Sequence, residues 1–299
     1  MSAAPVVSSP AYSQPSLPEC NVCKSTEKVS ACAKCNIAFY CSKDHQISDW
    51  KIHKLTCKPT LWSILKSQEK EWLGASEDVC LPQTKKMSRK DYWGKENAEA
   101  SSQPPTLLPK FLNDYPLNFP NKLAIDLGCG RGHASLWLLE QGWRVIAVDF
   151  SSKSLAILKS DADRINKQWI QSGQLQIVES DIAKFEFPQE ATLVYASASL
   201  NYVDPKKIKE VWDKIHKSLI AGGAFVAFLL YDWVPKAPAM YQMTRRIQLE
   251  MGAWLINDLD AVKQALTQSN YEIFNCYCRT ESYIPGNLPA YIDFAAIKK

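Results

Sequence analysis

The sequence lacks any apolar run long enough to cross a membrane. Its longest apolar stretch is AFVAFLLY at residues 224–231, whereas a membrane helix needs roughly 20 residues. The first ten residues, MSAAPVVSSP, have neither a basic flank nor an apolar stretch of signal length. We therefore expect a soluble intracellular protein without membrane contact. We expect it to be cytoplasmic, with a nuclear location or delivery into a host cell kept as alternatives.

An excess of charge of one sign is also missing. The 35 basic and 31 acidic residues leave a formal net charge of +4, and the basic residues are spread along the chain. This balance makes nucleic-acid binding unlikely. No internal repeat is visible. Apolar residues make up 46% of the 299, which is enough to bury a sizeable core and argues against wholesale disorder.

Cysteine is concentrated in one short part of the chain. Six of the ten cysteines lie between residues 20 and 57. Without a signal peptide, this crowding favours metal binding over disulfides. Eight candidate ligands suit two tetrahedral zinc ions in closed, structural sites. In chain order the candidate ligands are Cys20, Cys23, Cys32, Cys35, Cys41, His45, His53 and Cys57.

Residues 43–56 contain no Gly or Pro and are expected to be helical. Side chains four residues apart share a helix face, so Cys41 with His45 would hold one ion and His53 with Cys57 another. The two histidines lie about 12 Å apart along a helix, and zinc ligands lie about 2.0–2.3 Å from the metal. One ion therefore cannot take all four residues. Spacing leaves open which C-x-x-C pair completes each site.

The full pattern C-x2-C-x8-C-x2-C-x4-Y-C-x3-H-Q-x3-W-x2-H-x3-C resembles a MYND zinc finger. The resemblance implies two interleaved sites, with His45 standing where the family usually has Cys. It also implies a docking module for a proline-rich peptide or protein. The implied ligand sets are Cys20, Cys23, Cys41 and His45 for one ion, and Cys32, Cys35, His53 and Cys57 for the other.

We divide the chain into a flexible tail at 1–19, a zinc module at 20–57, a linker at 58–105 and a larger domain at 106–299. Within the linker, residues 61–73 predict a short amphipathic helix that ends at Gly74. Tyr92 and Trp93 are candidate lid residues. Residues 105–109 read PTLLP, which either docks on the finger or opens a helix with Leu107 and Leu108 in the core.

Strands and helices alternate from residue 106 onward. Continuous apolar strands between helices predict a parallel sheet covered on both faces. The last two strands, YEIFNCYCRTE and AYIDFAAIKK, are expected to close the sheet as an antiparallel pair. The other expected strands are 122–127, 143–149, 175–180, 192–197 and 224–231, with helices at 133–141, from 151 or 152, and at 205–219.

The stretch IDLGCGRGH at 125–133 runs from a strand through three glycines into a helix. Glycines allow a tight turn and a close approach of ligand to backbone, and a helix N-terminus presents free N–H groups. Asp149 ends the next strand, 19 residues after Gly130. The nicotinamide-dinucleotide fingerprint G-x-G-x-x-G is not met, because the sixth position counted from Gly128 is His133.

The loop D-x-G-x-G-x-G, led by Asp126, resembles class I methyltransferases that use S-adenosylmethionine. VDFS (148–151), ESDI (179–182) and LIAGGAFV (219–226) continue the resemblance in order. It implies an α/β, Rossmann-like doubly wound sheet, mostly parallel with an antiparallel last strand. The implied cofactors are S-adenosylmethionine and two zinc ions. The implied cofactor-binding residues are Asp126, Gly128, Cys129, Gly130, Gly132, Asp149, Phe150, Asp181, Ile182 and Ser197.

Each of these residues has an implied role. Asp126, Gly128 and Gly130 would hold the amino-acid half of the cofactor, and Cys129 and Gly132 complete the loop as small residues. Asp149 would bind the ribose.

The remaining implied roles concern the adenine and the methyl group. Phe150 would lie against adenine, Asp181 would meet its amino group, and Ile182 would pack beside it. Ser197 would face the sulfonium and the methyl acceptor.

The run LGCGRGHASLWLLEQGWRVIAVDFS resembles small-molecule methyltransferases, including the tellurite-resistance and thiopurine-like group, and this implies a small acceptor. Strand 192–197 ends in ASASLNYV (196–203), without the D/N-P-P-Y of enzymes that methylate amino groups of bases or glutamine and without the Pro-Cys of cytosine methylation. The paired-glutamate loop of arginine methyltransferases and the SET motifs are also missing. A protein methyltransferase targeted by the finger and a non-catalytic cofactor-binding adaptor are the alternatives.

We nominate no catalytic residue. Tyr202, Tyr231 and Asp232 lie just past strand ends and are candidates for the acceptor pocket. We interpret His133 and His216 as structural.

Overall fold

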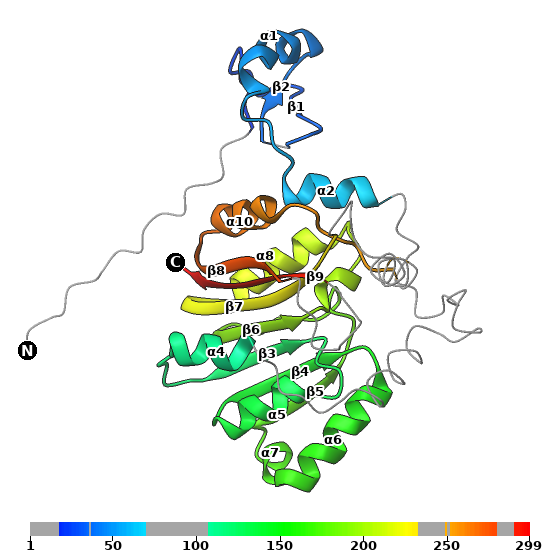
Figure 1. Ribbon diagram of the computed structural model, residues 1–299, viewed down its shortest axis with the longest axis vertical. Helices are drawn as coiled ribbons and strands as arrows, with labels where there is room; N and C mark the ends of the chain where they lie inside the picture. The colour runs from blue at the N-terminus through cyan, green and yellow to red at the C-terminus, as the bar shows by residue number, and fades with distance from the viewer. Residues whose placement is uncertain (1–17, 36, 70–106, 233–248, 250–251, 280–289) are drawn as a thin grey trace, which may run out of the picture. The chain divides into compact units, whose positions relative to one another are not determined.

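The computed structural model describes residues 18–35, 37–69, 107–232, 249, 252–279 and 290–299. The chain divides into two compact units, Met1–Pro59 and Thr60–Lys299, and Figure 1 traces the elements of each. No helix within these ranges is long and apolar enough to cross a membrane. The candidate lid residues Tyr92 and Trp93 lie outside the described ranges.

The first unit is a small hairpin followed by one helix. Strands β1 (Ser30–Ala31) and β2 (Phe39–Tyr40) pair antiparallel. Helix α1 (Lys43–His53) starts at Ser42, whose hydroxyl accepts a hydrogen bond from the His45 N–H. The helix ends at His53, earlier than the predicted residue 56, so the chain reaches Cys57 through a turn rather than along the helix.

The second unit is built on a seven-stranded sheet in the order β5-β4-β3-β6-β7-β9-β8. Neighbouring strands from β5 to β7 pair in parallel, whereas β9 runs antiparallel to both β7 and β8. The predicted mostly parallel sheet with an antiparallel last strand is confirmed. The strands are β3 (Leu123–Leu127), β4 (Arg144–Asp149), β5 (Leu175–Glu179), β6 (Ala191–Ser197), β7 (Leu219–Tyr231), β8 (Tyr271–Arg279) and β9 (Ala290–Lys298).

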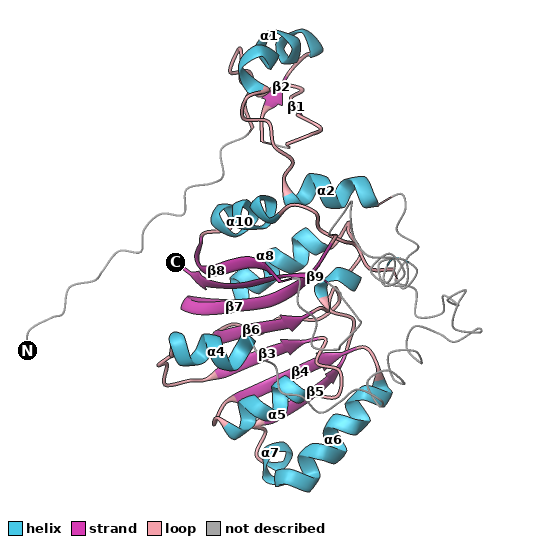
Figure 2. Cartoon of the chain, viewed as in Figure 1, coloured by secondary structure: helices cyan, strands magenta, loops and turns pink. Residues whose placement is uncertain are grey.

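Helices cover both faces of this sheet (Figure 2). In β3, Ile125 and Leu127 belong to one apolar cluster and Ala124 to the other, as the alternation of a strand requires. One face packs against α2 (Leu61–Gln68), α8 (Ile208–Ser218) and α10 (Leu259–Gln268). The other packs against α4 (Leu107–Asp114), α5 (His133–Glu140), α6 (Ser152–Asn166) and α7 (Gln168–Gln171).

Strand β7 is longer than the sequence expectation. It begins at Leu219 instead of 224. Between two successive pairing positions, β7 advances by five residues to Ala224, whereas β6 advances by only two, from Ala191 to Leu193. Gly222, with φ +77°, lies in this irregular part, so the predicted glycine turn is a bulged strand start.

Helix α2 ends at Gln68, and the predicted end at Gly74 lies outside the described ranges. Its Gln68 side chain exchanges two hydrogen bonds with the backbone of Leu255, at 2.6 and 3.1 Å. Helix α4 begins at Leu107. Leu107 and Leu108 are 5% and 0% exposed, which favours the helical alternative for PTLLP.

The chain reverses its direction of travel across the sheet between β3 and β6. From β3 it moves outward through β4 and β5, then returns to β6 on the opposite side and continues to β7. The short helix η1 (Leu200–Tyr202) follows β6. Ligands of open α/β sheets bind in the crevice outside the carboxyl ends of the strands at such a reversal. This rule predicts a ligand site at the carboxyl ends of β3 and β6.

Candidate zinc centres and cofactor crevice

The first group of metal ligands joins the first C-x-x-C pair to the start of α1. Its four donor atoms all lie within 4.8 Å of one another. His45 Nδ1 is 3.5 Å from Cys20 Sγ and 3.2 Å from Cys41 Sγ, and Cys23 Sγ is 3.5 Å from Cys41 Sγ. Tetrahedral zinc, with Zn–S and Zn–N bonds of about 2.3 and 2.0–2.1 Å, holds its ligand atoms roughly 3.3–3.8 Å apart. This group therefore has the dimensions of a zinc site.

The second group joins the second C-x-x-C pair to the end of α1. Cys32 Sγ lies 3.8 Å from Cys57 Sγ, and Cys35 Sγ lies 3.5 Å from His53 Nε2. These sulfur separations are far longer than the roughly 2.05 Å of a disulfide, and all four residues are buried. The His53 ring also meets the edges of Tyr40 and Trp50. The structure thus brings the eight predicted ligands together in the two interleaved sets that the MYND resemblance implied.

The glycine loop after β3 has no room for side chains at two positions. Gly128 has φ +68°, and a Cβ there would lie 2.3 Å from Ser199 Cβ. Gly132 has φ +84°, and a Cβ there would lie 2.2 Å from Leu158 Cδ1. Side chains rarely adopt such backbone angles, and neither neighbour leaves space for one. The loop backbone is therefore packed closely against Ser199 at Gly128 and against Leu158 of α6 at Gly132.

Asp149 fastens the middle of this loop to the end of β4. Its Oδ2 accepts a hydrogen bond from Gly130 N at 2.9 Å, and its Oδ1 accepts one from Ser151 N at 2.8 Å. The residue is only 6% exposed. Burial raises the pKa of the Asp149 carboxyl group, while these backbone donors oppose the rise. The carboxylate is thus held directly beside the backbone of the glycine loop.

Asp126 is a second buried carboxyl group in the same place. It lies in β3, is 2% exposed, and accepts a hydrogen bond from Ser135 Oγ at 2.6 Å. Burial raises its pKa to about 7, and the nearby charge of Asp149 adds to the rise. Two neighbouring buried carboxyl groups favour a cationic ligand, because a cation stabilises their ionised forms.

The other predicted cofactor residues follow the neighbouring strands. Phe150 is half-buried directly after β4. Ile182 is buried, three residues after the end of β5. Asp181 Oδ1 accepts a hydrogen bond from Ala183 N at 2.8 Å and stabilises that turn. Ser197 is exposed at the end of β6. Because the carboxyl ends of parallel strands meet at one edge, the structure brings these residues to the edge that carries the glycine loop.

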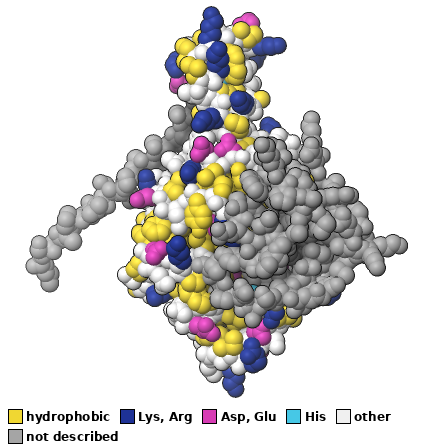
Figure 3. All heavy atoms as spheres, in the orientation of Figure 1, with side chains coloured by type: hydrophobic (Ala, Val, Ile, Leu, Met, Phe, Trp, Pro, Cys, Tyr) yellow, Lys and Arg dark blue, Asp and Glu magenta, His cyan; other side chains and the backbone are white. Residues whose placement is uncertain are grey.

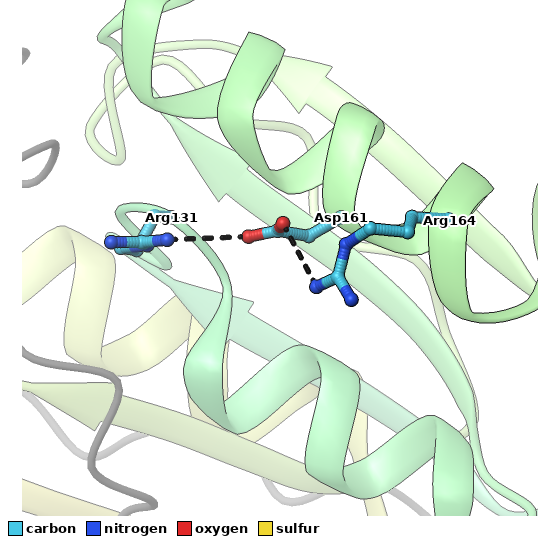
Figure 4. A network of polar contacts seen from close by, with 3 residues as sticks. All are labelled: Arg131, Asp161 and Arg164. Carbon is cyan, nitrogen blue, oxygen red and sulfur yellow. Dashed lines mark hydrogen bonds and ion pairs between the residues drawn. The ribbon is translucent and has the colours of Figure 1, made fainter.

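Three residues that sequence reasoning missed hold the loop in place. Ser199 Oγ donates a hydrogen bond to Leu127 O at 2.6 Å. Ser135 Oγ donates one to the carboxylate of Asp126, just before the loop. Arg131 in the loop reaches Asp161 of α6 at 3.4 Å, and Asp161 also pairs with Arg164 (Figure 4). The only sequence signal for Ser199 was its position directly after a predicted strand.

The predicted acceptor-side residues and His133 lie near the carboxyl ends of the strands, and His216 lies near the opposite, amino ends. Tyr202 packs beside Leu230 in a small apolar cluster. Tyr231 is the last residue of β7, at the carboxyl end of the sheet that also carries the glycine loop. The Asp232 N–H, one residue later, donates to the Ile256 carbonyl at 2.7 Å. Burial raises the pKa of the Tyr231 hydroxyl.

His133 begins α5, and burial together with the nearby Arg131 lowers its pKa. His216 lies at the other edge, in the last turn of α8, just before β7 begins. Its ring lies edge-on to Tyr271 at 4.9 Å, and its carbonyl oxygen accepts a hydrogen bond from Lys298 Nζ.

Comparison with known proteins agrees with both units. Residues 20–57 match the MYND finger family and residues 124–223 match a methyltransferase domain family. Egl nine homolog 1 of Homo sapiens is 46% identical over 39 residues, which are 13% of this chain and 9% of that protein. The carboxy-S-adenosyl-L-methionine synthase of Pseudomonas fluorescens is 29% identical over 111 residues, 36% of this chain and 44% of that protein.

The fold is also found among solved structures. TehB from Haemophilus influenzae aligns with a TM-score of 0.51 at 15% identity, covering 71% of this chain and 68% of that one. This chain spans less than half the length of the curated relatives named above. The chain thus contains a MYND finger at residues 20–57 and a methyltransferase domain with the class I, Rossmann-like fold that includes residues 124–223.

Proposed function

We propose that residues 106–299 transfer a methyl group from S-adenosylmethionine to a small-molecule acceptor. We also propose that residues 20–57 bind two zinc ions and dock a proline-rich peptide or protein. The observation that carries the enzymatic proposal is the glycine loop held between Asp149, Ser199 and Leu158 where the sheet reverses direction. A loop fixed on three sides is preorganised, so ligand binding need not order it.

The residues present fit an adenosyl sulfonium. Asp126 and Asp149 are buried, and burial raises the pKa of both carboxyl groups. A cation bound beside them would restore their charged forms. The free N–H groups at the start of α5 suit the carboxylate of an amino acid. The relative that is 29% identical is named for carboxy-S-adenosyl-L-methionine, which supports a ligand of this class.

The proposed contacts follow from the order of the strands. Asp149 would accept hydrogen bonds from the ribose hydroxyls, since each carboxylate oxygen has a second lone pair beyond its backbone bond. Phe150 and Ile182 would flank the adenine, and Asp181 would meet its amino group. Gly128, Cys129, Gly130 and Gly132 would line the amino-acid half together with Asp126.

When bound, the cofactor would supply a methyl group on a sulfonium, from which a neutral thioether is a good leaving group. The protein's contribution is then alignment of the acceptor, which can supply several kcal/mol of the barrier. Ser197 would face the acceptor from the end of β6. Tyr202, Tyr231 and Asp232 would line the acceptor side. A general base is required only for an acceptor that has a proton to lose.

Exposed apolar side chains support docking by the finger. This 38-residue module exposes large apolar residues next to basic ones, and Figure 3 shows both kinds on its surface. Exposed large apolar side chains on a module this small are candidates for contact with a partner. The exposed apolar residues of the module are Val22, Ile37, Ile47, Trp50, Ile52 and Leu55.

Calorimetric titration of the full chain with S-adenosylmethionine is the first test. Transfer of isotopically labelled methyl groups in a cell extract, separated into small molecules and proteins, is the second. We expect cofactor binding and label in the small-molecule fraction. Label in protein alone would favour a protein methyltransferase targeted by the finger. Binding without any transfer would favour the adaptor, and the absence of binding would refute both enzymatic versions.

Docking is tested separately with the full chain. A proline-rich peptide is titrated into the zinc-loaded protein and into protein stripped of zinc by a chelator. We expect binding only with zinc present, because the metal maintains the fold of so small a module. Equal binding in both states would contradict docking by the finger.

A further inference from the structure

The two ligand groups of the finger have the same donors but different burial. Each group offers three cysteines and one histidine. In the second group every ligand is buried: Cys32 is 3%, Cys35 1% and Cys57 5% exposed, and His53 is 9% exposed. Both groups hold three thiolate donors and differ only in the histidine nitrogen, Nδ1 of His45 and Nε2 of His53, so a difference in thiolate reactivity must come mainly from their surroundings.

The first group is open to solvent on one side. Cys20 is fully buried, but Cys23 is exposed and Cys41 and His45 are partly exposed. Oxidation of a thiolate depends on its charge and on its exposure. Zinc keeps its cysteine ligands as thiolates in both groups, so exposure is the deciding difference. Cys23 is therefore the ligand that a dissolved oxidant reaches most easily.

Burial is not the only feature that protects the thiolates of the second group from oxidation. The Ile37 N–H donates a hydrogen bond to Cys35 Sγ at 3.5 Å, and donation of this kind withdraws electron density from a metal-bound thiolate. The rings of Tyr40 and Trp50 lie against His53. Cys32, Cys35 and Cys57 share one apolar cluster with Tyr40.

Cys41 is placed to complete the oxidation of Cys23. Their sulfur atoms are 3.5 Å apart, and a disulfide needs about 2.05 Å. Once the metal no longer holds the sulfurs apart, a movement of about 1.5 Å joins them. The two residues left, Cys20 and His45, are half of the four ligands that a structural zinc site uses.

We propose that Cys23 and Cys41 are a modification site for hydrogen peroxide, at which disulfide formation expels the zinc ion of the first group alone. The Cys23 thiolate attacks one peroxide oxygen, the O–O bond breaks, and a sulfenic acid and hydroxide form. The Cys41 thiolate then attacks the Cys23 sulfur and displaces the second hydroxide. Two electrons pass from the thiolates to the peroxide, two protons from solvent turn the hydroxides into water, and zinc leaves as Zn²⁺.

Zinc release from the full-length protein tests this proposal. Protein loaded with two equivalents of zinc is treated with hydrogen peroxide in the presence of a chromogenic chelator. Thiols are then mapped by alkylation and mass spectrometry. We expect one equivalent to be released at least about tenfold faster than the other, with a Cys23–Cys41 disulfide in the fast phase. Cys276 is an internal control, because burial raises its pKa to about 12 and keeps the thiol protonated.

Histidine substitutions provide matched variants, because the finger already uses histidine as a ligand in each group. Cys23→His keeps four ligands and removes the exposed thiolate, so the fast phase should disappear. Cys35→His makes the same change in the buried group and should leave the fast phase unchanged. If either variant fails to retain zinc, the thiol map of the unaltered protein decides. Simultaneous release of both ions, earlier oxidation of the buried group, or no release would overturn the proposal.

Discussion

The carboxylate of Asp149 accepts a hydrogen bond from the backbone N–H of Gly130 at 2.9 Å, so the end of β4 fixes the loop that follows β3. One side chain thereby links β4 to the loop after β3, at the proposed cofactor site. Its buried oxygens also face the place where a ribose would bind under the proposed function. Under the proposed function Asp149 would therefore have two roles, which a substitution would remove together.

Asp149→Ala should weaken binding of S-adenosylmethionine at least about tenfold, about 1.4 kcal/mol. Both the fixed loop and the proposed acceptor of ribose hydrogen bonds are lost. Isothermal titration calorimetry measures the change. Asp213→Asn is the matched control, since Asp213 forms a surface pair with Lys209 on α8. An affinity unchanged by Asp149→Ala would contradict the assigned role.

Gly128→Ala should destabilise the protein more than Gly142→Ala does. Both glycines have positive φ, but a Cβ at 142 meets no atom within 4 Å, whereas one at 128 overlaps Ser199. The backbone term costs roughly 1–2 kcal/mol at each site, and steric overlap adds to it only at Gly128. Urea unfolding of both variants gives the comparison. Adding Ser199→Gly should recover part of the loss in Gly128→Ala, and no recovery would mean that Ser199 is not the constraint.

The affinity for S-adenosylmethionine should rise as the pH increases toward 7 and then level off. Burial raises the pKa of ligand-free Asp126 to about 7, and a bound cation lowers it, so binding below that pH must release a proton. The groups that face Asp126 are Ser135, Asp149 and Cys129. Titrations between pH 5.5 and 8.5 should show this slope, and Asp126→Asn should flatten it. A profile of equal slope in the variant would assign the proton to another group.

Asp126 should also lower the stability of the ligand-free protein at neutral pH. Its pKa is raised from 3.8 to about 7 in the folded state, so the stabilisation it contributes is complete below 3.8. That contribution is lost as the pH rises toward 7. Asp126→Asn should therefore raise the melting temperature at pH 8 by more than at pH 5. Thermal denaturation at the two pH values checks the difference, and an equal shift at both would contradict it.

Removal of zinc should unfold the finger and spare the larger unit. The first unit's buried cluster consists of Cys32, Cys35, Ala38, Tyr40 and Cys57, which is too small to fold without metal. The second unit, Thr60–Lys299, has two large apolar clusters of its own. Limited proteolysis with and without a chelator should show early cleavage within 20–57 only when zinc is removed. Loss of protection across both units would contradict this independence.

Much of the architecture could be read from local patterns. The central strands of the parallel part were visible because both of their faces are largely apolar, as in β3, where all five residues are buried. Element ends were less accurate where tertiary contacts decide them. Helix α1 ends at His53 rather than 56 because the chain turns there to bring Cys57 into the second ligand group.

The residues that hold the glycine loop could not be found in the same way. Ser199 is 72 residues from its hydrogen-bond partner Leu127, and Leu158 comes from a different helix. Local propensity has no information on such pairs, because they depend on the order of strands in the sheet. The sequence indicated that Gly128 and Gly132 matter but not which side chains require them to be glycine.

By itself the amino-acid sequence determined the eight metal ligands, the α/β class and the glycine loop with its acidic strand ends. These properties depend on residue type and on spacing over a few turns, which survive without tertiary context. The tertiary structure alone decided the hydrogen bond from Gly130 to Asp149, the rise in the Asp126 pKa and the unequal burial of two candidate zinc sites that have the same residue types. Burial and long-range contact are properties of packing, so they arise only when distant segments come together.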